Sequence, residues 1–464
     1  MFFSFYSFGC KLNQLEGEAV INAFKRSGFS FLSWNKYHKA ALLIINTCTV
    51  TSMAEQKARR LIRKALKELP SCCVIVTGCY AQLDEVALLK LQENESTQRL
   101  FVVSGDKKDL LLDLPLFILS EFSSFTLPPL PELSKAINTF FDNNSTSEEG
   151  SFRFKPEEFS LHSRAFLKIQ DGCDRSCTYC RVSIARGKSR SLASAEILSE
   201  LKNLEAKGIN EAVFTGVNIC QYNDNGKNLP GLLNYLLGAT DKICLRLSSL
   251  EPEALDSYFF DVLKNPRIRP HFHLSLQSGS DTVLNRMGRP YTSLDVLNVV
   301  KELRSVKDDP FLACDIISGF PGEGESDFES TYSLCESVKF SWIHVFPFSP
   351  RPGTAAYAFN DRVAESEVKQ RCERLKFLAQ KGRRDYIESC KGREVEAIVE
   401  STDSDTKSDS ALAFVPATSE NYLKLLVRCE DKELPAPGSL VKCRISSNVE
   451  SKTSKAFDAE ALLL

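Results

Sequence analysis

Three cysteines lie close together in the segment Gly172–Cys180, which reads GCDRSCTYC. Cys173, Cys177 and Cys180 form a C-x3-C-x2-C pattern directly after an apolar, strand-like segment. Three thiolates bind only three of the four irons of a cubane cluster, which leaves the fourth iron open to another ligand. A structural zinc site normally closes with four protein ligands, and no fourth Cys or His follows at a matching distance. The pattern therefore favours an iron–sulfur cluster with one open iron, and a zinc knuckle is the alternative.

A second set of cysteines, Cys10, Cys48 and Cys79, is widely spaced, but each follows a segment with the pattern of a β-strand. These strand candidates are Phe2–Phe8, Ala41–Ile45 and Cys72–Val76, with a fourth at Leu100–Val103 and amphipathic helices expected at Leu15–Arg26 and Met53–Leu69. Alternating strands and helices predict a parallel sheet, and the carboxyl ends of parallel strands share one edge. We therefore expect the three cysteines to meet there, the alternative being three unrelated thiols in turns.

The composition limits the class of protein. The chain has 464 residues and a net charge of −2, with 43% hydrophobic and 25% charged residues, so we expect two to four ordinary globular domains. A nucleic-acid site must then be a local basic face. The Met1–Ser4 start lacks a basic export signal and no apolar run has membrane-spanning length, which predicts a cytoplasmic protein without a membrane partner. In that reducing compartment, closely spaced thiols among the 16 cysteines indicate metal ligands.

The remainder of the chain predicts two further folds. From Arg164 onward about six strand–helix units recur, which is typical of an incomplete parallel barrel with its chemistry at the carboxyl ends of the strands. The expected strands are Ala165–Ile169, Glu211–Thr215, Ile243–Ser248, His271–Leu276, Leu312–Ser318 and Trp342–Phe346, and a charged helix follows at Ala364–Ser389. Five short strands then predict a small antiparallel barrel of a type that often binds nucleic acid, at Glu394–Glu400, Ala411–Pro416, Tyr422–Arg428, Ser439–Ser446 and Phe457–Leu464.

The fold class is therefore α/β with three folded parts. We expect a doubly wound parallel sheet domain at residues 1–125, a linker at 126–160, a partial (βα)6 barrel at 161–388 and the small β-barrel at 389–464. The linker is expected because the periodic pattern fails between Leu110 and His162, where Pro128–Pro131 and the polar run Asp142–Ser151 are typical of loops.

The C-x3-C-x2-C pattern with Tyr179 before its last cysteine resembles the signature of the radical S-adenosylmethionine (SAM) superfamily. The resemblance implies a [4Fe-4S] cluster whose open iron chelates SAM, and whose reduction produces a radical able to take hydrogen from an unactivated C–H bond. It also places the segment Asp315–Glu323, with Gly319, against the SAM adenine, and Tyr179 near it. Ser248 and Glu251 are candidates for the SAM ribose or methionine, although barrel-end polar residues without that role look the same.

The motifs FGCKLN at Phe8–Asn13, INTCTV at Ile45–Val50 and VTGCYAQ at Val76–Gln82 resemble the three cysteine motifs of the methylthiotransferase family. The resemblance extends over nearly the whole chain, since the last part is similar to a TRAM domain, a small RNA-binding barrel. It implies a second [4Fe-4S] cluster on Cys10, Cys48 and Cys79. One departure is the segment Arg181–Gly187, where the family usually has apolar residues and a proline, and this puts the local packing in question.

Further phrases favour the branch of the family that acts on N6-threonylcarbamoyladenosine at tRNA position 37, and they lie at Lys168–Cys173, Thr215–Ile219, Arg246–Pro252 and His344–Thr354. The product would be the 2-methylthio derivative, with one SAM as methyl donor, a second as radical source and the auxiliary cluster holding the sulfur. The implied partners are tRNA and an electron donor such as a flavodoxin or ferredoxin. The same chemistry on isopentenyladenosine in tRNA or on a ribosomal-protein aspartate, and a zinc-containing RNA-binding protein without catalysis, remain alternatives.

Two other groups of residues have less certain roles. The predicted helix Met53–Leu69 carries a basic set that suits RNA phosphates, although a solvated surface explains it equally well: Lys57, Arg59, Arg60, Arg63, Lys64 and Lys67. His271 and His273 alternate on one predicted strand, and we expect them to line the barrel and not to bind a metal.

Overall fold

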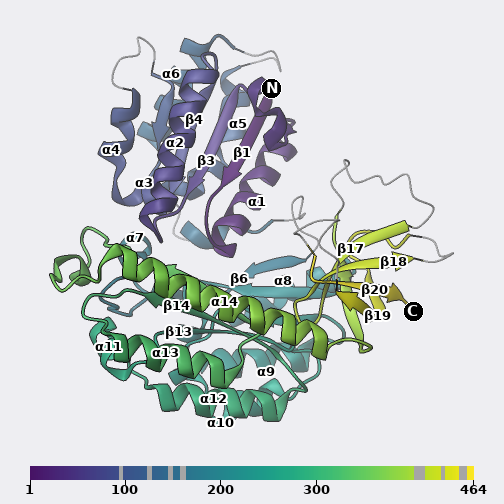
Figure 1. Ribbon diagram of the computed structural model, residues 1–464. Coiled ribbons are helices and arrows are strands. Elements are labelled where there is room, and N and C mark those ends of the chain that lie inside the picture. Colours follow the sequence, from purple (N-terminus) through teal and green to yellow (C-terminus); the bar gives the residue numbers. More distant parts are fainter. Residues whose placement is uncertain are drawn as a thin grey trace. The chain divides into compact units, whose positions relative to one another are not determined.

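The computed structural model describes residues 1–92, 98–122, 128–144, 150–156, 164–401, 413–429, 434–448 and 457–464. The chain forms two compact units (Figure 1), which are described separately. The first consists of Met1–Phe159, Gln170–Arg190 and Ser349–Thr354, and the second of Ser160–Ile169, Ser191–Phe348 and Ala355–Leu464. The C-x3-C-x2-C loop therefore belongs to the same unit as the N-terminal sheet, although the chain returns to the second unit on both sides of it.

The first unit is built on a five-stranded sheet in the order β2-β1-β3-β4-β5, and all its neighbouring strands are parallel. The strands are β1 (Phe2–Ser7), β2 (Ser30–Leu32), β3 (Leu42–Thr47), β4 (Cys73–Gly78) and β5 (Leu100–Val102). The chain order reverses between β1 and β3, and such a switch point opens a crevice at the carboxyl ends of the strands. Cys10 and Cys48 follow these two strands, so the expected doubly wound sheet is confirmed.

Helices cover this sheet because their apolar residues recur at helical spacing. The helices before the C-x3-C-x2-C loop are α1 (Lys11–Arg26), α2 (Ser52–Glu68), α3 (Cys79–Leu83), α4 (Glu85–Leu89), α5 (Leu114–Glu121) and α6 (Leu130–Asn143). On α2, Ala58, Ile62 and Ala65 are fully buried in one core cluster with residues of β3 and β4. The hydroxyl of Thr51 accepts a hydrogen bond from the amide of Ala54 and caps the start of α2.

The expectation of an unstructured linker is wrong for part of the segment. Helix α5 and the 14-residue helix α6 lie between Leu114 and Asn143, and the rings of Phe117 and Phe140 pack 5.1 Å apart. Proline in a first helical turn loses no intrahelical hydrogen bond, so Pro131 starts α6 where we expected a loop. Of the polar run, residues 145–149 lie outside the described residues. The domain limits at residues 125, 160 and 388 stay predictions.

The second unit contains the partial parallel barrel, and its expected six strands are present. They are β6 (Ala165–Lys168), β9 (Glu211–Thr215), β12 (Cys244–Leu247), β13 (His271–Gln277), β14 (Phe311–Ser318) and β15 (Trp342–Pro347). They form two parallel three-stranded sheets, β12-β9-β6 and β13-β14-β15. Single parallel bridges, such as Leu250 with Leu274, join the sheets between β12 and β13. Short two-stranded pairs are β7 (Gln170–Asp171) with β8 (Arg190–Ser191) and β10 (Asn223–Asp224) with β11 (Lys227–Asn228).

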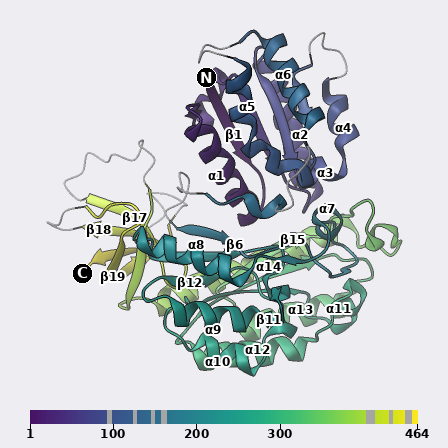
Figure 2. The ribbon, with the colours of Figure 1, turned by 180° about the vertical axis from the view of Figure 1, so that it is seen from behind.

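Helices follow the barrel strands, and α9, α10 and α12 lie side by side along them in both views (Figure 1 and Figure 2). The helices of this part are α8 (Ser194–Ala206), α9 (Leu229–Ala239), α10 (Ser257–Leu263), α11 (Asp281–Met287), α12 (Ser293–Val306), α13 (Glu325–Val338) and α14 (Glu365–Ser389). Within the described ranges, no helix has both the length and the apolar character needed to cross a membrane.

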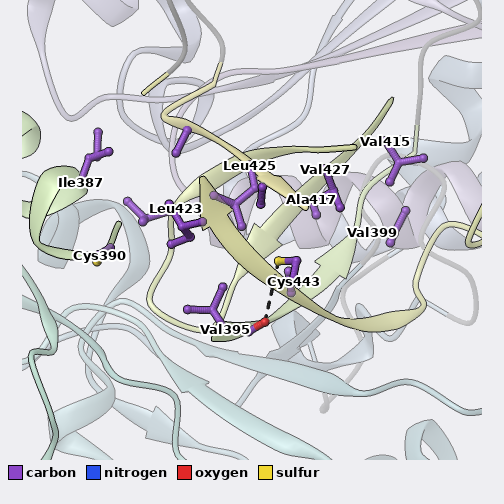
Figure 3. Packing of buried hydrophobic residues seen from close by; sticks show 14 of the residues in the cluster. Ile387, Cys390, Val395, Val399, Val415, Ala417, Leu423, Leu425, Val427 and Cys443 are labelled. Atoms are coloured by element: carbon purple, nitrogen blue, oxygen red, sulfur yellow. Dashed lines mark hydrogen bonds between the residues drawn. The ribbon is translucent and has the colours of Figure 1, made fainter. Parts of the chain in front are cut away.

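The C-terminal strands form a closed barrel in the order β16-β17-β18-β20-β19. They are β16 (Glu394–Val399), β17 (Ala413–Ser419), β18 (Lys424–Cys429), β19 (Leu440–Asn448) and β20 (Ala459–Leu463), and Figure 3 shows the apolar side chains that fill the interior. Four neighbouring pairs are antiparallel, whereas β18 and β20 are parallel. An odd number of strands cannot alternate in direction around a closed barrel, so the expected fully antiparallel barrel is wrong for that one pair.

A buried ionic cluster joins the small barrel to the partial barrel within this unit. Glu211, at the start of β9, accepts hydrogen bonds from Arg246 at 2.6 and 2.9 Å and from Arg269 at 3.1 Å. Arg269 also donates to Glu396 of β16 at 2.8 Å, and Arg246 donates to the carbonyl of Ser419 at 3.1 Å. These arginines lower the pKa of the Glu211 carboxyl to about 2, although burial alone would raise it.

Glu211→Gln is expected to lower the free energy of unfolding by about 3–5 kcal/mol at neutral pH, because it leaves buried arginines without their charged partner. A carboxylate with a lowered pKa stabilises the folded state above its unfolded pKa of about 4.3. This stabilisation is lost as the pH falls toward about 2, so the difference between wild type and variant should shrink over that range. Denaturant unfolding at several pH values measures it. The exposed Glu336→Gln is the control, and an equal effect of both substitutions would refute the role of the cluster.

Candidate metal centre

The first set of cysteines lies at the carboxyl ends of three neighbouring strands of the N-terminal sheet. Cys10 follows β1 and precedes α1, Cys48 follows β3, and Cys79 follows β4 as the first residue of α3. Gly9 and Gly78 make these turns with φ of +96° and +99°. A Cβ atom on Gly9 would lie 2.8 Å from Cys48 Sγ, and one on Gly78 would lie 2.3 Å from the Thr47 carbonyl oxygen. Only glycine therefore allows the backbone to approach this closely.

The second set lies on the loop between β7 and α7 (Val182–Arg186). The amide of Cys173 donates to the carbonyl of Gly187 at 3.0 Å, and the amide of Cys180 donates to the carbonyl of Cys177 at 3.1 Å. Gly172 has φ of +73°, and a Cβ atom there would lie 1.9 Å from the Lys188 carbonyl oxygen. Backbone contacts thus close the loop on itself and keep its three thiols together.

Backbone amides donate to the cysteine sulfurs in both sets. In each case the donor is two residues further along the chain: Val50 to Cys48 at 3.5 Å, Arg175 to Cys173 at 3.4 Å and Val182 to Cys180 at 3.4 Å. Such N–H···S bonds stabilise a thiolate and tune the potential of a bound cluster. The donors are part of the loop backbone, so these bonds do not depend on the side chain at the donating position.

The thiols of the first set affect one another electrostatically. Burial raises the pKa of Cys48 to about 12, and the neighbouring thiols Cys10 and Cys79 raise it further. Cys48 is buried, Cys79 is half-buried and Cys10 is exposed, so the set opens toward the surface through Cys10. A buried thiol at this position releases its proton only when a positive charge, such as a metal, replaces it.

Arg186 connects the two cysteine loops inside the first unit. Its guanidinium, with a side-chain exposed fraction of 10%, donates to Glu16 at 2.8 Å, to Asp171 at 3.1 Å and to Asn13 Oδ1 at 2.9 Å. The amide group of Asn13 in turn donates to the carbonyls of Phe8 and Thr47 at 2.8 and 3.1 Å. One side chain pair therefore links the backbone before Cys10, the backbone before Cys48 and the C-x3-C-x2-C loop.

The departure from the family pattern after Cys180 is accommodated by ion pairs. Arg181 is buried and donates to Glu55 at 3.3 Å and to Asp84 at 3.2 Å. Arg351, from the returning segment of this unit, pairs with the same Glu55 carboxylate and donates to Thr49 at 2.9 Å. An arginine fits the position because two carboxylates compensate its charge.

The four predicted SAM-contacting residues are divided between the units. Tyr179 belongs to the first unit, whereas Ser248, Glu251 and Gly319 follow strands β12 and β14 of the second. Glu251 is buried and accepts from Arg289 at 2.8 and 3.1 Å. A Cβ atom on Gly319 would lie 2.3 Å from Val368 of α14, so this glycine is also required by packing. The roles of all four residues in binding SAM stay predictions.

A polar group on the barrel strands was not among the predicted sites. His273 lies 3.0 Å from an Asp315 carboxylate oxygen, its Nδ1 lies 3.2 Å from the Ser249 hydroxyl, and its ring is 5.1 Å from that of His344. Alternation with His271 was the only signal of this group in the sequence. The partners come from three other segments, so their meeting depends on the barrel.

The two cysteine sets fit iron–sulfur clusters in donor chemistry, in their amide-to-sulfur bonds and in the nearby positive charge of Arg186. Among the described residues, no three Cys, His, Asp or Glu side chains converge on a point as ligands of a single metal ion do. Cubane ligands do not need to converge in this way, because each thiolate binds a different iron and the cluster lies between them.

Comparisons with known proteins agree with this geometry. Residues 167–335 match the family model of the radical SAM superfamily, and residues 3–98 match that of uncharacterized protein family UPF0004. The fold is similar to the structure of the radical S-adenosylmethionine methyltransferase TsrM from Kitasatospora setae, with a TM-score of 0.51 and 16% identity over 76% of each chain. The fold and the family model thus define a radical SAM enzyme.

Relatives with higher identity narrow the class. The threonylcarbamoyladenosine tRNA methylthiotransferase MtaB of Treponema pallidum is 37% identical over 94% of this chain and 96% of its own length. The tRNA-2-methylthio-N(6)-dimethylallyladenosine synthase of Geobacter metallireducens is 31% identical over 80% of this chain and 81% of its own. The chain belongs to the threonylcarbamoyladenosine tRNA methylthiotransferase family.

Arg186→Gln and Glu16→Gln test the connection between the loops. Each substitution alone leaves a buried charge with fewer partners, so the double variant is expected to be less destabilised than the sum of the two by about 1.5–3 kcal/mol. Denaturant unfolding of the four apoproteins measures this coupling. Lys90→Gln, an exposed position outside the network, provides the control pair with Glu16→Gln and should be additive. Additivity of Arg186→Gln with Glu16→Gln would refute the connection.

Proposed function

We propose that this protein adds a methylthio group to C2 of N6-threonylcarbamoyladenosine at position 37 of tRNA by radical SAM chemistry. The supporting observation is that one compact unit contains both cysteine sets, linked by Arg186 and Asn13. An enzyme that uses a radical at one cluster and sulfur at another needs a fixed arrangement of the two. The names of the most similar relatives supply the substrate.

In this proposal Cys173, Cys177 and Cys180 hold the cluster that binds SAM, and a second set holds the auxiliary cluster: Cys10, Cys48 and Cys79. When bound, the cluster and SAM supply a radical that removes hydrogen from an unactivated C–H bond. The chain itself contributes positive charge and amide donors around the thiolates. Arg186 and Arg351 lie beside the first set, and their electrostatic interactions with Cys79 and Cys48 favour the deprotonated sulfurs.

The predicted SAM contacts are kept in modified form. Ser248 is half-buried at the end of β12 and is the candidate for a direct contact. Glu251 is held by Arg289, so its expected role is to fix the loop after β12. Tyr179 and the backbone at Gly319 remain candidates for the adenine. The remaining partner is an electron donor such as a flavodoxin or ferredoxin, and a cytoplasmic location suits oxygen-sensitive clusters.

A second candidate substrate is N6-dimethylallyladenosine, also called isopentenyladenosine, in tRNA. The observation in its favour is the Geobacter metallireducens relative, whose identity of 31% is close to that of the threonylcarbamoyladenosine group. The chemistry at the cysteine sets would be the same for both substrates. The choice between them therefore depends on the base modification that the protein accepts.

The ligand assignment predicts opposite results for two variants. Anaerobically prepared wild type should contain about eight irons per chain, and Cys48→Ala and Cys173→Ala about four each. Cys173→Ala should lose SAM cleavage, whereas Cys48→Ala should keep cleavage and lose thiolation, because only the auxiliary set is altered. Iron and sulfide analysis with a cleavage assay measures this. Cys72→Ala, at a buried cysteine outside both sets, should keep the full iron content. Normal thiolation by Cys48→Ala would refute the assignment.

The substrate is tested by mass spectrometry of tRNA nucleosides from cells with and without the protein. We expect loss of the 2-methylthio form of N6-threonylcarbamoyladenosine and accumulation of its unthiolated precursor. Re-expression of wild type should restore the modified nucleoside, and Cys173→Ala should not. Loss of the 2-methylthio-isopentenyl species instead would favour the second candidate.

A further inference from the structure

Helix α2 concentrates positive charge in a chain that is nearly neutral. Its 17 residues include six basic side chains and two carboxylates, against a net charge of −2 for the whole protein. A general bias toward basic residues therefore does not explain the helix. The question is which of these charges are used inside the fold and which remain available.

The structure divides the six basic residues into two groups. Arg59 donates to the Tyr80 hydroxyl at 2.6 Å, and Lys64 lies 3.8 Å from the Glu68 carboxylate. The other four are exposed, and within the described ranges they have no ion-pair or hydrogen-bond partner from their side chains: Lys57, Arg60, Arg63 and Lys67. We call these four residues the basic stripe.

The basic stripe lies on one face of the helix. At 3.6 residues per turn its members fall within an arc of about 120° and extend over about 15 Å along the axis. The opposite face, with Ala58, Ile62 and Ala65, is fully buried against β3 and β4. Figure 1 shows α2 running along the strands of this sheet. Because the buried face fixes the helix, the four cations are presented on a rigid surface.

The carboxylates of the helix do not neutralise the stripe. Glu55 is buried and bonds with Arg181, Arg351 and Thr49. Glu68 accepts a hydrogen bond from the Tyr37 hydroxyl at 2.6 Å and pairs with Lys64. The charges of the four stripe residues are thus uncompensated on the helix that carries them.

The stripe is also close in sequence to the auxiliary cysteine set. Helix α2 begins at Ser52, four residues after Cys48, and Thr51 caps its first turn. A polyanion bound along the stripe would therefore pass the start of the helix that follows a cluster ligand.

We infer that the basic stripe of α2 binds the sugar–phosphate backbone of the tRNA substrate. Exposed, unpaired Lys and Arg side chains on a rigid helix neutralise phosphates and release the counterions condensed on the RNA. Such contacts position the nucleic acid without reading its sequence. The inference rests on the proposed function, because tRNA is the polyanion that this function requires.

The test compares two variants with the same loss of charge. In the stripe variant Lys57, Arg60, Arg63 and Lys67 are replaced by alanine. In the control variant four exposed lysines of other helices, without printed partners, are replaced by alanine: Lys202, Lys301, Lys369 and Lys376. Binding of the reconstituted holoprotein to unthiolated tRNA is measured by fluorescence anisotropy between 0.05 and 1 M KCl, as about the range in which counterion release dominates.

For the stripe variant we expect the slope of log K against log salt to become shallower by about 0.7–0.9 for each lost contact. Four contacts correspond to a loss of affinity of roughly 100-fold or more at about 0.1 M salt, and the curves should converge near about 1 M. The KM for tRNA should rise more than kcat falls, since the lost contacts bind substrate and transition state alike. The control variant should keep the wild-type slope, and both variants should keep the wild-type iron content.

A stripe variant with the slope and affinity of the control variant would overturn the inference, while thiolation of tRNA by wild type would leave the proposed function intact. Equal losses in both variants would also overturn it, since total charge and not this surface would then govern binding. If wild type neither binds nor thiolates tRNA, both proposals fail together. Measuring wild type in the same series distinguishes these cases.

Discussion

The arrangement of the two cysteine sets depends on the buried guanidinium of Arg186. It meets Glu16 on α1 and Asp171 beside the C-x3-C-x2-C loop, and it also bonds Asn13, which contacts the backbone before Cys10 and before Cys48. A buried arginine is tolerated only when carboxylates compensate it, and each of these carboxylates needs the arginine in return. Mutual dependence of this kind fixes loops that come from distant parts of the chain.

The backbone completes what these charges begin. Gly9, Gly78 and Gly172 turn the chain where a Cβ atom would collide with a neighbouring loop, and this brings the cysteines into their sets. The amides that follow at i+2 then donate to sulfur. Cluster ligands are thus held by contacts that are independent of most side chains, which allows an arginine at position 181 where the family pattern has an apolar residue.

The second unit uses a different device. The partial barrel and the small C-terminal barrel share the ionic cluster around Glu211, and an apolar cluster that includes Phe311, Tyr386 and the interior of the small barrel. Charge and apolar packing together make one body of the two barrels. The basic stripe of α2 belongs to the other unit, so the proposed contacts with RNA are not confined to the RNA-binding type of barrel at the C-terminus.

The sequence by itself determined the elements with strong periodicity and the cysteine motifs. Strand Glu211–Thr215 and helix Ser194–Ala206 have the predicted bounds, because local patterns specify such elements. The sequence did not reveal helix α6, whose prolines are compatible with a first turn as well as with a loop, or the parallel pair β18–β20, which follows from closing five strands. Tertiary structure alone decided that Arg186, Glu16 and Asn13 meet, and which basic residues of α2 stay unpaired. The physical reason is that an ion pair depends on distance in space, and local sequence patterns contain no information about partners 170 residues away.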